Sequence, residues 1–358
     1  MRSRVKFPIS KGFLEIGEGL PSYLISEIGL NHNGSEELAR NMIYESALSG
    51  ATFVKFQKRS LSDLATSDFL DAPFEKCPVF GSTQREVRER LEFPLEIYIR
   101  LREYAESLGL VFFASAFDLP SLNFLNEAGV KIIKVASHSV TNGPLLMELA
   151  KRKTPVIVSL GGTTENERDE AIKILKDNPM VLMHCVSAYP TPDNMVKLDT
   201  IIKLKNKYKM PVGFSSHEKG IDISVAAALL GACIIERHFT LNTATVGLDH
   251  GISLEPNEFS ELAKKVHRMH NIRGSVEDIQ ESEYATKHSY HVAICASRDI
   301  KKGEKITEEL LEFKQPLINA TAFFTGMEAN RILGSTALID LKRDKAIRRD
   351  AVSSINHI

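Results

Sequence analysis

Short runs of aliphatic, β-branched and aromatic residues recur along the chain as far as residue 239. Between these runs, apolar residues return every three or four positions, which is the period of a helix with one buried face. None of the runs alternates strictly between polar and apolar residues, so each predicts a strand that is buried on both faces. Eight runs follow this rule: 22–29, 52–57, 110–117, 131–137, 155–161, 180–187, 211–217 and 233–239.

Eight strands that alternate with eight helices predict a (β/α)8 barrel, also called a TIM barrel. A doubly wound open sheet is the alternative, but such sheets have fewer repeats. Ser35 is a candidate N-cap, and Thr164 with Glu167 has the spacing of a capping box. Residues 1–20 predict a short β-type arm. Residues 58–94 are too long for a plain turn and predict an insertion that folds over the barrel mouth.

The pattern changes beyond about residue 280. Residues 281–290 predict a polar linker, and residues 291–358 predict a strand, a lysine-glycine turn and a short helix, followed by a second strand and turn. This assigns residues 1–280 to the barrel domain and 291–358 to a second domain, which is small for an independent core.

Composition places the chain among soluble globular proteins, with 43% hydrophobic and 25% charged residues in 358. The formal net charge of -1 gives no electrostatic reason to expect nucleic acid or an anionic membrane as a partner. No apolar run approaches the length of a membrane span or of a signal peptide, so we expect a cytoplasmic protein. The four cysteines form no CxxC pair, and Cys185 and Cys233 are expected to be buried thiols.

Active sites of such barrels lie at the carboxyl ends of the strands. The last polar residues of the eight runs should therefore meet in one pocket. Two lysines among several hydroxyls suit a small anion that carries phosphate or carboxylate, because an unpaired buried lysine is costly. The residues at these ends are Glu27, Lys55, Gln57, Ser115, Lys134, Ser137, Ser159, His184, Ser187, Tyr189, His217, Glu236 and His238.

His217 and His238 end neighbouring runs that are separated by one apolar helix, close to Glu236 and Asp249. This arrangement predicts a metal-assisted site in which two protein ligands leave positions for water and substrate. Imidazole ligands alone suit zinc and several other divalent ions. The alternative is a pair of core histidines that are hydrogen-bonded to the backbone. His184 is expected to be such a structural histidine.

Several motifs resemble the sialic acid synthase family, which makes N-acetylneuraminate and related nonulosonic acids and includes a spore-coat polysaccharide branch. The C-terminal SRDIKKGEKIT resembles the antifreeze-like SAF domain of that family, which has a β-clip fold. Together the matches cover nearly the whole chain. The motifs in the barrel are SEIGLNHNG, VKFQKR, QREVRERLEFPLEIY, KVAS followed by TNGPLL, HCVSAYPTP, and IERHFT ahead of GLDHGISLEP.

The resemblance implies condensation of phosphoenolpyruvate with a 2-acylamino hexose, N-acetylmannosamine or a modified analogue, with release of phosphate. It also implies a divalent metal, typically manganese with magnesium or cobalt as alternatives, and a homodimer in which the SAF domain of one subunit caps the barrel of the other. The implied roles are metal binding by His217 and His238; phosphoenolpyruvate binding by Lys55, Ser115, Lys134, Ser137 and Ser159; sugar binding by Gln57, Tyr189 and Asp249; and catalysis by Glu27 and Glu236. The residues do not choose which of the two carboxylates is the base.

The chain departs from the family pattern at several places. Ser216 stands where the family has aspartate before the first histidine, and Ser187 where some members have asparagine. Residues 136–139 read Ala-Ser-His-Ser instead of Gly-Ser-Gly-Glu. Residues 314–319, Lys-Gln-Pro-Leu-Ile-Asn, replace an arginine-containing segment that reaches the acyl group of the sugar. The loss of that guanidinium indicates a different sugar or a cap that binds differently.

Two other functions remain open at this point. One is a phosphoenolpyruvate-dependent 3-deoxy-sugar-acid synthase that acts on another sugar. The other is a catalytically weak sugar-binding paralogue of the spore-coat type. Lys55 and Lys134 could also serve only as ion-pair partners of Glu27 and Glu236 that stabilise the fold.

Overall fold

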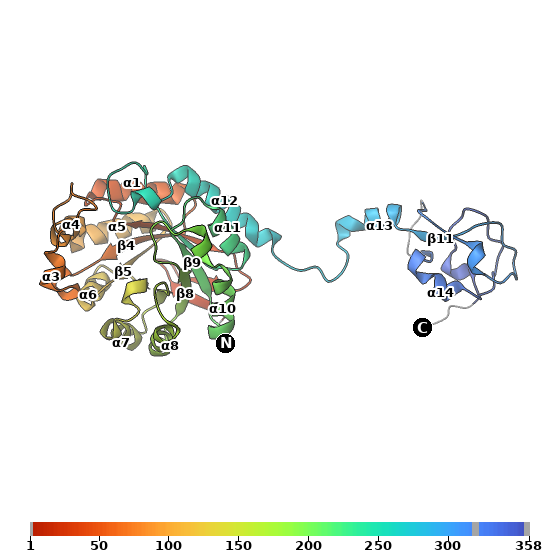
Figure 1. Ribbon diagram of the computed structural model, residues 1–358, viewed down its shortest axis with the longest axis horizontal. Coiled ribbons are helices and arrows are strands. Elements are labelled where there is room, and N and C mark those ends of the chain that lie inside the picture. Colours follow the sequence, from red (N-terminus) through yellow and green to blue (C-terminus); the bar gives the residue numbers. More distant parts are fainter. Residues whose placement is uncertain (1–2, 317–321, 354–358) are drawn as a thin grey trace. The chain divides into compact units, whose positions relative to one another are not determined.

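The computed structural model describes residues 3–316 and 322–353. The chain forms two compact units, Met1–Arg273 and Gly274–Ile358 (Figure 1). The boundaries that the sequence predicts at residues 280 and 290 stay predictions.

The first unit is built on a closed barrel of eight parallel strands in the order β10-β3-β4-β5-β6-β7-β8-β9. Each predicted run contains one of these strands, so the predicted TIM barrel is confirmed. The strands are β3 (Tyr23–Gly29), β4 (Phe53–Lys58), β5 (Val111–Ala116), β6 (Ile133–Val135), β7 (Val156–Ser159), β8 (Met180–Cys185), β9 (Val212–Ser216) and β10 (Ile234–His238).

Helices surround the barrel on the outside (Figure 1). They are α1 (Glu36–Leu48), α5 (Leu95–Ser107), α6 (Leu119–Glu127), α7 (Gly143–Arg152), α8 (Glu165–Ile174), α10 (Asp199–Tyr208), α11 (Asp222–Leu229) and α12 (Pro256–Ile272), with the short α9 (Asp193–Val196) between α8 and α10. The Ser35 side chain accepts a hydrogen bond from the Leu38 amide, and Thr164 and Glu167 form a complete capping box. Both predicted caps are confirmed, and each satisfies amides that the helix cannot pair internally.

The strands are buried because their side chains face either the barrel interior or the helices. Phe53 and Phe113 are fully buried and meet edge to face, with ring centroids 5.8 Å apart. Each buried side chain of this size contributes on the order of 1.5–3 kcal/mol through removal of apolar surface from water. The barrel is therefore a packed core, and the polar residues on its strands lie in the middle or the carboxyl half of each strand.

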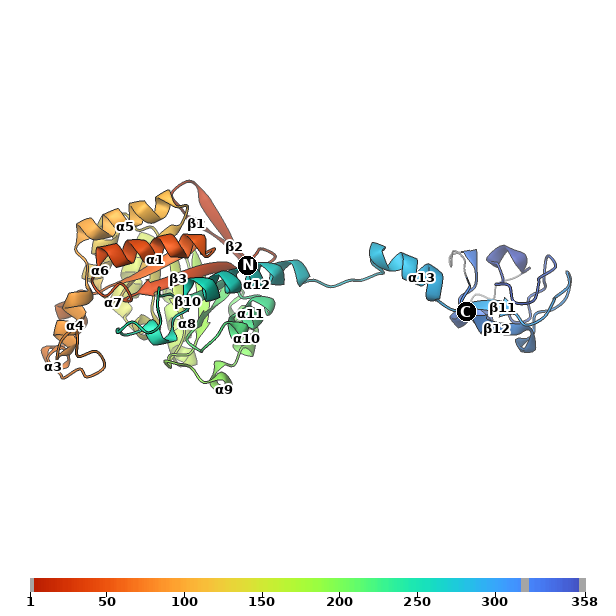
Figure 2. The same cartoon turned by 90° about the horizontal axis from the view of Figure 1, so that it is seen from above.

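Different segments lie at the two ends of the barrel (Figure 2). At the amino end, β1 (Arg4–Pro8) and β2 (Phe13–Gly17) form an antiparallel hairpin whose Phe7 and Ile16 are fully buried, which confirms the predicted arm. At the carboxyl end lies the insertion, with α2 (Leu61–Leu64), α3 (Ser67–Leu70) and α4 (Gln84–Leu91). Val87 and Leu91 of α4 pack on Leu30 in a small apolar cluster, which holds the insertion against the barrel.

The second unit has its own small core, which includes Ile294, Ile300, Phe324 and Ile347. Its antiparallel strands are β11 (Ala293–Ala296) and β12 (Leu311–Lys314), and its helices are α13 (Tyr284–Tyr290) and α14 (Ala329–Ile332) with the 3₁₀ turns η3 (Glu281–Glu283), η4 (Glu308–Leu310), η6 (Gly326–Glu328) and η7 (Arg349–Ala351). Within residues 3–316 and 322–353, no helix is long and apolar enough to cross a membrane.

Candidate active site

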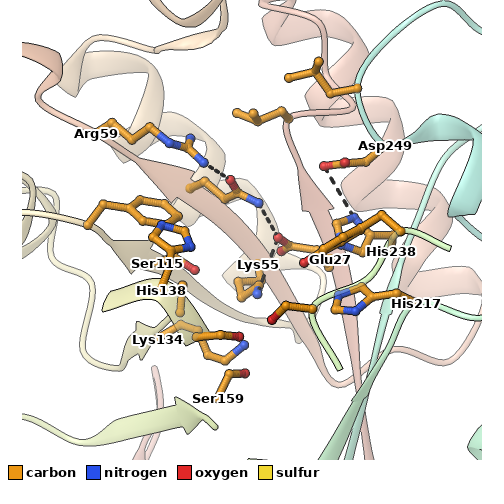
Figure 3. A pocket seen from close by; sticks show the side chains of 18 of the residues that line it. Glu27, Lys55, Arg59, Ser115, Lys134, His138, Ser159, His217, His238 and Asp249 are labelled. Atoms are coloured by element: carbon orange, nitrogen blue, oxygen red, sulfur yellow. Dashed lines mark hydrogen bonds and ion pairs between the residues drawn. The ribbon is translucent and has the colours of Figure 1, made fainter. Parts of the chain in front are cut away.

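A cavity of about 490 Å³ opens at the carboxyl end of the barrel. All eight strands, or the loops that follow them directly, contribute to its lining, as expected for this fold. Figure 3 shows many of these side chains pointing into the same space. Every residue for which the resemblance implies a role lines the cavity: Glu27, Lys55, Gln57, Ser115, Lys134, Ser137, Ser159, Tyr189, His217, Glu236, His238 and Asp249.

Two buried lysines share one carboxylate on the floor of the cavity. Lys55 Nζ lies 2.9 Å from Glu236 Oε1, and Lys134 Nζ lies 2.9 Å from Oε1 and 3.0 Å from Oε2. The Ser215 hydroxyl donates a third hydrogen bond to Oε1 at 3.0 Å. The ion-pair network that was left open as an alternative is therefore present.

The network sets the charge of its members. Burial alone would raise the pKa of Glu236, but the ammonium groups of Lys134 and Lys55 outweigh it and hold that pKa well below its usual range. Burial lowers the pKa of Lys134, whereas for Lys55 the carboxylates of Glu236 and Glu27 outweigh burial and raise the pKa. Glu236 is therefore an anion fixed between two cations.

Glu27 is in a different state, although it lies in the same network. Its Oε1 accepts a hydrogen bond from Gln57 Nε2 at 2.7 Å and lies 3.4 Å from Lys55 Nζ. Its Oε2 is buried and has no hydrogen-bond partner. Burial raises the pKa of Glu27 to about 7, because Lys55 offsets only part of the cost of removing the carboxylate from water. Glu27 can therefore gain or lose a proton near neutral pH.

Gln57 links this network to Arg59, which the sequence analysis missed. An Arg59 N–H donates to Gln57 Oε1, so the amide nitrogen of Gln57 faces Glu27 (Figure 3). Arg59 directly follows β4, and its place after the motif VKFQK was a signal that could have found it. The hydrogen-bond chain fixes the orientation of the Gln57 side chain.

The hydroxyl groups surround the lysines from neighbouring strands. Ser115 lies on β5 and Ser159 ends β7, and both are buried. Ser137 follows β6 in a 3₁₀ turn (η1, Ser137–Ser139), and its Oγ lies 3.3 Å from the sulfur of Cys185. All four cysteines are free and buried, as predicted for Cys185 and Cys233.

His217 and His238 lie side by side on the other side of the cavity, with ring centroids 5.5 Å apart. Burial lowers the pKa of each imidazole to about 3, so both are neutral near pH 7. His217 Nδ1 donates to the Val186 carbonyl at 2.9 Å, which leaves Nε2 as an acceptor. His238 Nδ1 is buried without a hydrogen bond and lies 3.8 Å from Asp249 Oδ2. His217 Nε2 and His238 Nδ1 are therefore the nitrogens that could hold a metal ion.

No third side chain completes a metal site. Among the described residues, no group of three or more His, Cys, Asp or Glu is arranged to hold an ion. Burial raises the pKa of Asp249 above its usual value. Tyr189 lies against His217 with ring centroids 4.1 Å apart, and 56% of its surface is exposed to the cavity mouth and solvent.

His184 has the structural role that was expected. Its Nε2–H donates a hydrogen bond to the Val196 carbonyl at 2.6 Å, and it does not line the cavity. Because its polar atom is directed toward the backbone of α9, it is not available to a ligand.

A buried ion pair lies behind the two histidines. Arg237 is 1% exposed; its Nη2 donates to the Glu218 carbonyl at 2.8 Å, and its Nη1 lies 3.4 Å from Glu218 Oε1. The Ser216 hydroxyl also donates to the Glu218 carboxylate. Glu218 therefore supplies a carboxylate next to the position where the family has aspartate. An arginine inside an apolar strand was the signal for this pair.

The structure describes only part of the segment 314–319, in which the chain departs from the SAF pattern of the family. Lys314 ends β12 and pairs with Asp344 Oδ1 at 2.7 Å, and Gln315 is exposed. Leu317, Ile318 and Asn319 lie outside the described residues.

Two family profiles match the chain. A NeuB family profile matches residues 42–278, and a SAF domain profile matches residues 291–353.

Named relatives cover most of the sequence. The N,N'-diacetyllegionaminic acid synthase of Campylobacter jejuni is 36% identical over 332 residues, which span 91% of this chain and 98% of the relative. The N-acetylneuraminate-9-phosphate synthase of Homo sapiens is 32% identical over 343 residues, 95% of each chain.

Solved structures agree with the fold. The N-acetylneuraminic acid synthetase of Leptospira borgpetersenii, in complex with citrate, is 34% identical with a TM-score of 0.68, over 80% of this chain and 96% of that one. A spore coat polysaccharide biosynthesis protein E from Chromobacterium violaceum, whose function is assigned only provisionally, is 26% identical with a TM-score of 0.79, over 93% and 100%.

Proposed function

The chain belongs to the NeuB family, and on that premise we propose that it condenses phosphoenolpyruvate with a 2-acylamino hexose to give a nonulosonic acid and phosphate. The names of its relatives support this proposal, because they include synthases of legionaminic and N-acetylneuraminic products. The observation that carries it is the meeting of two buried ammonium groups and two neutral imidazoles in one cavity.

Phosphoenolpyruvate is expected on the floor of the cavity. Its phosphate and carboxylate would replace part of the contacts that Glu236 now makes with Lys55 and Lys134. Ser115 and Ser159 add hydroxyl donors from adjacent strands. Preorganised cations of this kind stabilise the charge that develops on a leaving phosphate, at no cost in reorganisation during the reaction.

The acceptor carbonyl is expected at the wall that carries His217 and His238. A divalent metal fits these residues, because the buried Nδ1 of His238 has no hydrogen-bond partner and both imidazoles are neutral. When bound, such an ion supplies Lewis acidity that polarises a carbonyl oxygen. The family resemblance makes manganese our proposed ion. Asp249 and Tyr189, which border the histidines, are positioned to orient the sugar.

Glu27 is our proposed proton-transfer group. Carbon 3 of phosphoenolpyruvate bonds to the aldehyde carbon of the sugar, whose carbonyl oxygen becomes a hydroxyl group by taking up a proton. This leaves an oxocarbenium ion at carbon 2, to which water adds. A base must take the proton of that water before the bond from carbon 2 to the phosphate oxygen breaks. Glu27 has a pKa of about 7 and a free Oε2, whereas Lys134 and Lys55 hold the pKa of Glu236 well below its usual range. The two environments separate the roles of the carboxylates.

Release of phosphate from phosphoenolpyruvate tests the proposal. The full chain is assayed with manganese and a panel of N-acyl mannosamines, diacetamido hexoses and arabinose 5-phosphate. Release with a 2-acylamino hexose supports the proposal, and release with arabinose 5-phosphate alone would replace it with a 3-deoxy-sugar-acid synthase. No release with any acceptor, together with a sugar-induced rise in the melting temperature, would indicate a binding protein.

The homodimer with a capping SAF domain stays a prediction from the resemblance. Light scattering of the full chain checks the dimer. Deletion of residues 281–358 is expected to impair sugar use more than manganese binding.

A further inference from the structure

One side of the cavity carries cations that the proposed chemistry does not use. We call Arg59, Lys76 and Arg88 the cationic wall; all three line the cavity, together with His138. In Figure 3, Arg59 and His138 lie on the left, whereas His217, His238 and Asp249 lie on the right, with Glu27 and Lys55 between them. The wall therefore lies across the cavity from the place where the acceptor carbonyl is expected.

The positive charge of the wall is not neutralised by its surroundings. Glu92 is shared between two cations: its Oε2 accepts from Lys58 Nζ at 2.9 Å, and its Oε1 lies 3.7 Å from Arg59 Nη1. Arg88 donates to the Gln84 side-chain amide at 3.3 Å. In the part of the chain that the structure describes, neither Arg88 nor Lys76 is within ion-pair distance of a carboxylate. Arg88 is half-buried and lines the cavity without a carboxylate partner, so an anionic ligand could supply the negative charge that its surroundings lack.

Aromatic rings hold the wall in place. The Arg59 guanidinium lies over the Phe117 ring, 4.1 Å from its centroid, and His138 stacks on Phe117 at 4.9 Å with an interplanar angle of 10°. Arg88 lies 5.3 Å from the centroid of Phe69. Contacts with ring faces do not occupy the N–H groups in the guanidinium plane. Arg59 already donates one of these groups to Gln57, and Arg88 uses its Nε–H for Gln84, so only the remaining N–H groups can bind an anion.

The state of His138 agrees with a positive potential at the wall. Burial, together with the charges of Arg59 and Arg88, lowers the pKa of its imidazole to about 4. The ring is therefore neutral near pH 7 and can still donate one N–H.

Space continues beyond the wall. Arg88 and His138 also line a second cavity of about 490 Å³, together with Leu64, Ala65, Thr66 and Phe69. Arg88 and His138 therefore border both cavities. Phosphoenolpyruvate, which belongs on Lys55 and Lys134 at the floor, does not account for these groups.

Resting on the proposed function, we propose that the acceptor sugar carries its own negatively charged group, a phosphomonoester or a carboxylate, at the end away from the reacting carbon, and that Arg88 and Arg59 bind it. The names of the relatives do not decide this, since the human relative is named for a phosphorylated product and the Campylobacter jejuni relative is not. For this chain, the positive charge of the wall favours a negatively charged acceptor. Arg88 is thus a specificity-determining residue, because it selects the acceptor without taking part in the bond changes.

The test measures kcat/KM for three acceptors at saturating phosphoenolpyruvate and manganese. They are N-acetylmannosamine, N-acetylmannosamine 6-phosphate and N-acetylmannosaminuronic acid, and the last two distinguish a phosphate from a carboxylate. We expect at least one charged acceptor to exceed the neutral one by about tenfold or more, as a hydrogen bond to a charged group allows. Arg88→Gln should lower this preference ratio about 10- to 100-fold, mainly through KM, and Arg88→Lys should recover part of it.

Arg85→Gln is the matched control. Arg85 lies on the same helix, but it pairs with Asp71 at 2.7 Å and does not line the active-site cavity. The preference ratio of this variant should equal that of the wild type. A thermal-shift series with the same three sugars and no phosphoenolpyruvate gives a second readout, in which the charged sugar raises the melting temperature of the wild type more than that of Arg88→Gln.

The outcomes separate the two proposals. Equal kcat/KM for neutral and charged acceptors, or a ratio that Arg88→Gln leaves unchanged, overturns the charged acceptor while the synthase stands. A higher kcat/KM for the neutral sugar would also overturn the charged acceptor, and it would point to an apolar acyl group in the second cavity. If no acceptor releases phosphate, the synthase proposal fails. The thermal-shift series then tests whether Arg88 and Arg59 bind an anionic group of the sugar. Equal shifts of the melting temperature for all three sugars would contradict this binding.

Discussion

Two groups of buried charges lie at the carboxyl end of the same barrel, and they differ in what they face. We call Arg237 with Glu218 the closed pair, and Lys55, Lys134, Glu27 and Glu236 the open cluster. The closed pair does not line the cavity, whereas the open cluster does.

In the closed pair, protein groups take up the terminal donors of the guanidinium. Arg237 Nη1 donates to Ser224 at 3.1 Å and to the Gly220 carbonyl, and Nη2 donates to the Glu218 carbonyl. Such a pair fixes the loop after β9 to β10, and hence the two strands that carry His217 and His238. Its charges pair with each other and with protein groups. Because neither residue lines the cavity, a ligand has no access to them.

In the open cluster, the charges remain available. Lys55 and Lys134 share a single carboxylate, and Glu27 has an oxygen with no partner. The cost of burying these groups is similar, but here a ligand can exchange for the protein partner. Missing partners alone do not distinguish the two groups, because Arg237 Nε and Glu218 Oε2 also lack hydrogen-bond partners. The difference teaches that burial of charge identifies a chemical site where the charges line a cavity.

The largest effect should come from the open cluster. Lys134→Met removes one ammonium that would hold the leaving phosphate, so phosphate release is expected to fall about 10³-fold. The fold should persist, because Glu236 keeps Lys55 and Ser215 as partners. Steady-state phosphate release and circular dichroism check the two statements. Activity within about tenfold of the wild type would contradict this role, since removal of one such donor costs at least about 10²-fold.

The closed pair should show the reverse behaviour. Arg237→Met leaves the Glu218 carboxylate buried without its cation, and we expect a loss of about 3 to 5 kcal/mol in the free energy of unfolding. Urea unfolding measures the loss. The double variant Arg237→Met/Glu218→Gln removes the stranded charge and should recover part of the stability. Single and double variants of equal stability would show that the pair is not coupled.

A pH profile sharpens the comparison within the open cluster. If Glu27 is the base, it must be unprotonated, so kcat should fall about tenfold per pH unit below its pKa of about 7. Glu27→Gln should lower kcat about 10²-fold and abolish this acid limb. An acid limb that persists in Glu27→Gln would assign it to another group.

Glu27 also has a defined effect on stability. The folded chain keeps this proton up to about pH 7, whereas the unfolded chain releases it near the ordinary glutamate pKa of 4.5. The folded state therefore binds more protons in this window, and stability falls as pH rises through it. Glu27→Gln should flatten that slope in urea unfolding at pH 5 and pH 8.

The smallest effect is expected from a pair in the second unit. Glu328 accepts from Arg349 at 2.6 Å and from Thr325, and these contacts lower its pKa to about 2. A depressed pKa stabilises the fold above pH 4.5 or so, and this stability is lost as pH falls toward 2. We expect about 1 kcal/mol, as for partly exposed pairs. Calorimetry of the full chain at pH 6 and pH 3 should show a smaller pH effect in Glu328→Gln.

The sequence predicted the barrel because each strand is an apolar-rich run that carries its polar residues in its middle or its carboxyl half. Parallel closure then brings Lys55, Lys134, His217 and His238 to one rim, even though they are far apart along the chain. The periodicity carries this information, so the fold and the cavity residues at the strand ends could be predicted, whereas Arg59 and Arg88 were missed.

The states of these residues could not be predicted in the same way. The separate pKa values of Glu27 and Glu236 depend on which carboxylate the lysines contact, and no spacing encodes that choice. Arg88 lies in an insertion of short helices and irregular segments, where its position depends on the contacts of α4 with the barrel. The stacking of His138 on Phe117 likewise joins two loops that are adjacent only in the folded chain.

A crystal structure with phosphoenolpyruvate bound tests the central claim most directly. The account predicts that the phosphate and carboxylate oxygens lie within ion-pair distance of Lys55 Nζ and Lys134 Nζ, where they replace contacts with Glu236. Phosphoenolpyruvate bound elsewhere, with both lysines still held by Glu236 at the distances seen here, would contradict it.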